Sequence, residues 1–198
     1  MCCIIAKFFP ETGWVGVKNR DRNYIPEISF AFSKEGKTDR LMFIDDMTSY
    51  QEGLNSHGIG VLGTSLMVID DEEVITTRNN SAKSDGQRIK NALAENTVEK
   101  VAQALIDEEL TGCTIVFDNE TCYLIEACIN TDKKYYYDME EIKQNKGVAR
   151  TNHGIYLDWA GYQYGVDEKQ DLSRESSESR LEQAQQVLKT ATTPQELI

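Results

Sequence analysis

The chain opens with residues 1–10, MCCIIAKFFP, a short apolar segment that ends at a proline. β-Branched, aromatic and small apolar residues dominate residues 2–8, and that composition favours a strand. Pro and Gly in residues 10–13 are typical of a turn, and residues 14–17, WVGV, are apolar again. The opening therefore predicts an N-terminal β-hairpin whose second strand leads into the polar residues 18–23, KNRDRN.

Strand-like and helix-like segments follow in blocks. Further strands are predicted at residues 28–32, 41–44, 114–117, 121–127, 134–139 and 148–152. Apolar residues at helical spacing begin after Ser84 and predict two consecutive helices, the second with Thr97 as its N-cap. A last helix is predicted from Ser177 to Thr190. This order of strands, two helices, strands and a helix indicates an α+β fold and not a doubly wound parallel sheet.

Charge and composition exclude several classes of function. The 198 residues include 21 Lys and Arg against 33 Asp and Glu, a net charge of −12, which argues against nucleic-acid and anionic-membrane partners. No apolar run is long enough to span a bilayer, and residues 1–10 lack the basic start of a secretory signal, so we expect a cytoplasmic protein. Five cysteines without paired spacing predict neither a disulfide framework nor a metal site, and no cofactor is expected.

A glycine pattern in the middle of the chain resembles a nucleotide-binding fingerprint only superficially. Gly58, Gly60 and Gly63 match G-x-G-x-x-G. They lie within a strand pattern, however, and lead into residues 66–69, LMVI, where the dinucleotide fingerprint requires a helix. We therefore assign these glycines to a hairpin around the turn 55–58.

Cys2 is the residue best suited to act as a nucleophile. Because methionine is normally removed ahead of a small residue, Cys2 is expected to become the mature N-terminus. It would then carry a thiol with a pKa of about 8.5 and an α-amine with a pKa of about 7.7–8.0, so its own amine could accept the thiol proton. Two alternatives stay open: Cys2 and Cys3 simply begin a buried strand, or they form a redox-active vicinal pair.

Four short motifs occur along the chain: Met1-Cys2 opening a strand, Asn19-Arg20-Asp21 after the next strand, Glu52-Gly53-Leu54-Asn55 with Gly58 on a later hairpin, and Thr151-Asn152-His153. In this order they resemble the N-terminal-nucleophile hydrolases of the choloylglycine hydrolase, penicillin V acylase and acyl-CoA:6-aminopenicillanate acyltransferase type. The resemblance covers about residues 2–190. It implies a single domain over residues 1–198 with a four-layer αββα sandwich, Met1 removed, and strands still to come beyond residue 198.

The resemblance also implies the reaction, which is hydrolysis of a linear amide in a small N-acyl substrate. Cys2 is the nucleophile, and Asp21 orients its amine. The backbone N–H of Ser65 and the side-chain amide of Asn152 are the implied oxyanion donors. Acyl transfer to an amine, and a non-catalytic binding module with the same fold, stay open as alternatives, as does assembly into a homo-oligomer.

Two cations are implied near the nucleophile. Lys18 stands where many relatives carry an arginine, so it keeps the positive charge but loses the two-pronged hydrogen bonding of a guanidinium. Arg180, near the start of the predicted last helix, resembles the arginine found near the active site of these enzymes.

Overall fold

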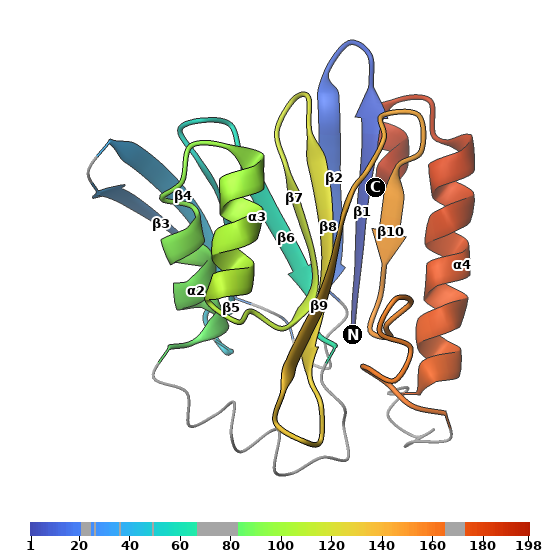
Figure 1. Ribbon diagram of the computed structural model, residues 1–198. Helices are drawn as coiled ribbons and strands as arrows, with labels where there is room; N and C mark the ends of the chain where they lie inside the picture. The colour runs from blue at the N-terminus through green and yellow to red at the C-terminus, as the bar shows by residue number, and fades with distance from the viewer. Residues whose placement is uncertain (21–24, 26, 36, 49, 67–82, 165–172) are drawn as a thin grey trace.

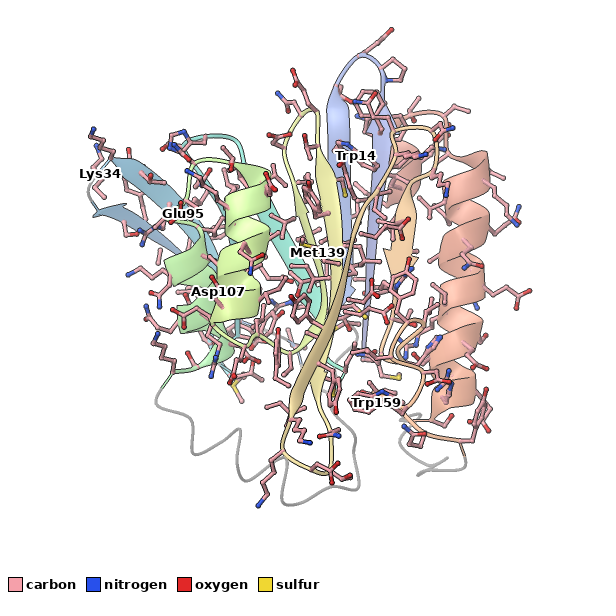
Figure 2. The ribbon with its side chains drawn as sticks, in the orientation of Figure 1. Trp14, Lys34, Glu95, Asp107, Met139 and Trp159 are labelled. Atoms are coloured by element: carbon pink, nitrogen blue, oxygen red, sulfur yellow. The ribbon has the colours of Figure 1, made fainter. Side chains whose placement is uncertain are left out.

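The computed structural model describes residues 1–20, 25, 27–35, 37–48, 50–66, 83–164 and 173–198. Within these residues the chain is a mixed α and β protein made mostly of strands, with three α-helices (Figure 1). The predicted α+β class is therefore confirmed. None of these helices is long and apolar enough to cross a membrane.

The strands form two antiparallel sheets. The larger has seven strands in chain order: β3 (Ile28–Glu35), β4 (Thr38–Asp45), β5 (Tyr50–Asn55), β6 (Gly60–Thr64), β7 (Gly112–Phe117), β8 (Cys122–Ile129) and β9 (Tyr135–Glu141). The smaller has the order β10-β1-β2, from β1 (Cys2–Phe9), β2 (Gly13–Arg20) and β10 (Val148–Arg150). The predicted N-terminal hairpin is thus confirmed. The glycines of the G-x-G-x-x-G match lie in and before β6, so the described strand supports their assignment to a hairpin.

Side-chain caps fix where the helices begin. Ser84 caps α2 (Asp85–Ala92) and Thr97 caps α3 (Val98–Asp107), as the sequence predicts. The last helix, α4 (Arg174–Thr190), begins three residues before the predicted start at Ser177, because Ser173 is its N-cap. A 3-10 turn, η2 (Pro194–Leu197), follows. The strand predicted at 148–152 also ends early, at Arg150.

Three apolar clusters hold these elements together. The first joins α2 and α3 to one face of the seven-stranded sheet, through residues such as Leu105 and Val116. The second lies between the two sheets and includes Ile4 and Ile115. The third packs α4 against the outer face of the three-stranded sheet and includes Ile5 and Leu181.

Strand β1 contributes to two of these clusters because successive side chains of a strand point to opposite faces. Ile4 and Ala6 face the larger sheet, while Ile5 and Phe9 face α4. Burial on both faces explains why residues 2–6 are continuously apolar. Figure 1 shows the resulting order, with α2 and α3 on one side, α4 on the other, and β1 and β10 beside α4.

Candidate active site

Cys2 lies at the start of β1 and is 7% exposed. Strand alternation places its side chain on the face of Ile4, between the sheets, and its register partner on β2 is Arg20. Cys3 points the other way, toward α4. The two thiols therefore lie on opposite faces of the strand, which argues against a disulfide between them.

The backbone nitrogen of Cys2 donates a hydrogen bond to Oδ1 of Asn152, with 2.9 Å between the two atoms. Arg180 Nη1 donates to the Cys2 carbonyl at 2.8 Å and to the same Asn152 oxygen at 3.2 Å. In this structure Met1 precedes Cys2, so the nitrogen is a peptide N–H. Removal of Met1 would make the same atom an α-amine already in contact with a side-chain acceptor.

Hydrogen bonds fix both the side-chain amide and the backbone N–H of Asn152. Its Nδ2 donates to Thr64 Oγ1 at 2.7 Å and to the Ser65 carbonyl at 3.1 Å. Its backbone N–H donates to Ser177 Oγ at 2.9 Å, which explains why the first turn of α4 is needed here. The structure thus places Ser65, an exposed residue directly after β6, beside Asn152, and its carbonyl oxygen makes the contact.

Lys18 and Arg20 form a buried network with Glu52. Lys18 Nζ lies 2.5 Å from Glu52 Oε1 and donates to the Gly63 carbonyl at 2.6 Å. Arg20 Nη2 lies 2.9 Å from Glu52 Oε2, and its Nη1 lies 3.2 Å from Asp45. Both cations of β2 are thus paired with Glu52 on β5, and Arg20 is paired with Asp45 on β4 as well, so these ion pairs hold β2 against the larger sheet.

Burial sets the electrostatics of this network. Burial lowers the pKa of Lys18, although Glu52 and then Cys2 oppose the shift. Burial also disfavours the charged form of Arg20, but Glu52, Tyr50 and Cys2 together outweigh it, and the pKa of Arg20 is raised. The pKa of Tyr50, whose ring centroid lies 4.6 Å from Lys18 Nζ, is raised well above its usual value by burial and then by Glu52. Tyr50 is thus a neutral neighbour of two cations.

Three of the six predicted site residues, Cys2, Asn152 and Arg180, contact one another directly, with Ser65 in contact with Asn152. Lys18 is close enough to Cys2 for their charges to interact. Asp21 lies outside the described residues.

Neither the models of known protein families nor the curated proteins include a match to this chain.

A cavity of about 600 Å³ adjoins this site between the two sheets. Lys18, Arg20 and Glu52 line one part of it. The remaining lining is mostly apolar or glycine: Gly16, Ile28, Phe43, Gly53, Leu54, Gly58, Gly60, Val61, Leu62 and Phe117. Because Arg20 is the strand partner of Cys2, the charged part of the cavity lies toward Cys2.

Glu126 anchors the segment that carries Asn152. This carboxylate is fully buried on β8 and lies 2.7 Å from Arg150 Nε. Its other oxygen accepts from the backbone N–H groups of Ile155, Tyr156 and Leu157 at 2.9, 2.8 and 3.3 Å. Asn152 thus sits between two points that Glu126 fixes, on either side of it in the chain.

Sequence reasoning gave no role to Arg20, Glu52, Thr64 or Glu126. Arg20 and Glu52 do lie inside the motifs that carried the resemblance, so a charged side chain in each of these motifs was an available signal. The contact between Thr64 and Asn152 spans 88 positions and could not be read from spacing. Within the described part of the chain, no three His, Cys, Asp or Glu side chains gather to hold a metal ion.

Proposed function

We propose that this chain is an N-terminal-nucleophile hydrolase of the choloylglycine hydrolase type, which cleaves a linear amide in an N-acyl substrate through Cys2. The observation that carries the proposal is the contact of the Cys2 nitrogen with Asn152 Oδ1, braced by Arg180. The sequence of helices, seven-stranded sheet, three-stranded sheet and α4 supports the four-layer αββα sandwich that this function implies.

In the proposed first half-reaction, Cys2 Sγ attacks the amide carbonyl carbon and its proton passes to the α-amine of the same residue. A carbon–sulfur bond forms and the carbonyl becomes an oxyanion. When the carbon–nitrogen bond breaks, the ammonium returns the proton to the leaving amine. The product is a thioester on Cys2 and a free amine.

In the second half-reaction a water molecule attacks the thioester carbon and gives a proton to the α-amine. The carbon–sulfur bond then breaks, the carboxylic acid leaves, and the thiolate takes the proton back. Asn152 Oδ1 holds the nitrogen in place for these transfers. Arg180 contributes by orienting that oxygen, and Asp21 is proposed as the second partner of the amine.

The proposed oxyanion donors are the backbone N–H of Ser65 and the Nδ2 group of Asn152. Nδ2 donates to Thr64 and to the Ser65 carbonyl in the structure. One of these two hydrogen bonds must therefore be exchanged for a bond to the substrate oxygen. Lys18 supplies positive charge near the thiolate, although its ion pair with Glu52 offsets part of that charge.

The proposal is tested with a panel of N-acyl amides and two cysteine variants. Cys2→Ala should abolish hydrolysis, because the nucleophile is gone. Cys3→Ala is the matched control, since Cys3 faces α4 and should leave the rate within a few-fold. Full activity of Cys2→Ala would refute the proposal.

A non-catalytic binding module with the same fold is the second candidate. The observation that favours it is that both protons of Asn152 Nδ2 are already used within the protein. For this candidate, acyl substrates bind without ever labelling Cys2 in protein that has lost Met1. Detection of a thioester on Cys2 would exclude it.

A further inference from the structure

The cavity beside Cys2 has a charged end and an apolar end. On β2, the residues Gly16, Lys18 and Arg20 share the face that lines it. Arg20 lies four positions after Gly16 along the strand, which corresponds to about 13 Å. Since Arg20 pairs with Cys2 in the sheet, the Gly16 end lies about that far from the nucleophile.

Phe117 occupies the apolar end. It is the register partner of Gly60 on β6, so the two lie side by side on one face of the larger sheet. A Cβ atom added to Gly60 would lie 3.1 Å from Phe117 Cζ, and one added to Gly16 on the opposite sheet would lie 2.5 Å from it. The ring therefore fills the space that side chains at these two glycines would take.

The charged end does not require a charged ligand, because its cations are paired with anions of the protein. Lys18 and Arg20 are cations, Glu52 and Asp45 are anions, and each cation lies within 3.2 Å of an anion. The other side chains that line the cavity are all apolar: Ile28, Phe43, Leu54, Val61, Leu62 and Phe117. A neutral apolar group matches this lining, because it gains by leaving water and leaves no charge unpaired.

We infer that Phe117 is a specificity-determining residue: it forms the end wall of the cavity and limits the length of the straight acyl chain that the site accepts. This inference rests on the proposed function for the direction in which the substrate enters. Each additional methylene that finds room is worth about a fourfold gain in affinity. Removing the ring of Phe117 opens the space between Gly16 and Gly60, which the end of a longer acyl chain can then occupy.

The test compares Phe117→Ala with Phe8→Ala in a background that carries Cys2→Ala, so that binding is measured without turnover. Phe8 is the matched control because its ring packs in the same apolar cluster, 5.8 Å from Trp14, and does not line the cavity. The probes are hexanoylglycine, decanoylglycine and tetradecanoylglycine, titrated by calorimetry. Phe117→Leu is the milder variant if the alanine variant does not fold.

We expect Phe117→Ala to raise the ratio of the affinity for tetradecanoylglycine to that for hexanoylglycine by about tenfold or more. Phe117→Leu should raise the same ratio by less. Phe8→Ala should leave the ratio unchanged. An unchanged ratio in both Phe117 variants, or an equal shift in Phe8→Ala, would overturn the inference.

Hydrolysis by protein with Cys2 intact separates this inference from the proposed function. A length shift in binding without hydrolysis of any probe supports the role of Phe117 and counts against the hydrolase. Hydrolysis whose chain-length preference is the same in wild type and Phe117→Ala overturns the role of Phe117 and leaves the hydrolase standing.

Discussion

Asn152 Oδ1 accepts hydrogen bonds from the Cys2 nitrogen and from Arg180, at 2.9 and 3.2 Å. The first residue of β1 is thereby joined to a residue 150 positions later in the chain. The contact puts the nitrogen that would serve as the catalytic base next to a fixed acceptor. Each part of this arrangement has a measurable consequence.

Replacing Asn152 removes both the acceptor for the amine and a proposed oxyanion donor. We expect Asn152→Ala to lower kcat by about 10²–10³ and to leave KM within a few-fold, because the lost contacts act mainly in the transition state. Steady-state kinetics on an N-acyl amide measures this. Asn119→Ala, in the exposed turn before β8, is the control and should keep its activity. A wild-type kcat in Asn152→Ala would contradict the assigned role.

Glu52 is expected to be essential for stability. Glu52→Ala leaves Lys18 and Arg20 buried without their shared anion, so we expect a loss of about 3–5 kcal/mol in the free energy of unfolding. Urea denaturation gives this value. As the control, Lys83→Ala breaks the more exposed pair with Glu108 and should cost about 1 kcal/mol or less. Equal losses in the two variants would contradict the stabilising role of the ion pairs around Glu52.

Glu126→Gln is expected to loosen the segment around Asn152. A neutral amide keeps the shape of the side chain but loses the ion pair with Arg150, and weakens the bonds to the N–H groups of residues 155–157. Hydrogen exchange at those amides should therefore become faster. Glu140→Gln is the matched control, because Glu140 is exposed on β9 and contacts only the hydroxyl of Tyr156 among these residues. Unchanged exchange in Glu126→Gln would contradict the anchoring role.

Cys3 should be a slow thiol whose reactivity depends steeply on pH. Burial, partly offset by Arg180, raises the pKa of Cys3 from 9.0 to about 11. At neutral pH its thiolate fraction is then about one hundred times smaller than that of an unperturbed thiol. Alkylation of Cys3, followed by peptide mapping, should accelerate about tenfold for each pH step up to about 11. Urea should abolish the protection, and a plateau near pH 9 in the folded protein would contradict it.

The same shift predicts how Cys3 affects stability. Its pKa is higher in the folded protein than in the unfolded chain, so between pH 9 and about pH 11 the folded state binds more protons. The contribution of Cys3 is therefore constant below pH 9 and destabilises the fold progressively as pH rises toward 11. Urea denaturation gives the free energy of unfolding of wild type and Cys3→Ala. From pH 8 to above pH 9, this free energy should fall more in wild type than in Cys3→Ala.

Local signals in the sequence predicted much of the fold. The hairpin of β1 and β2 follows from two apolar runs around a Pro-Gly turn, and Ser84 and Thr97 mark two helices through their own side chains. The start of α4 was missed because its apolar spacing begins only at Leu181, while the first turn from Arg174 is polar. That turn is set by the Ser173 cap and by Ser177, which binds the backbone of Asn152.

The candidate site was predictable only where a residue type carries the chemistry. Cys2 and Asn152 could be named from motifs, and the structure brings them into contact. The pairing of Lys18 and Arg20 with Glu52 depends on how the two sheets face each other, which no spacing along the chain encodes. The same holds for Phe117, whose place between Gly16 and Gly60 depends on strand register and on sheet packing together.

The most direct test of the central claim is intact-mass analysis of the purified protein before and after brief exposure to an N-acyl amide. We predict a mass lacking Met1, and then a transient increase equal to the acyl group that disappears with hydroxylamine and is absent in Cys2→Ala. Active protein that retains Met1, or an acyl group that forms equally on Cys2→Ala, would contradict it.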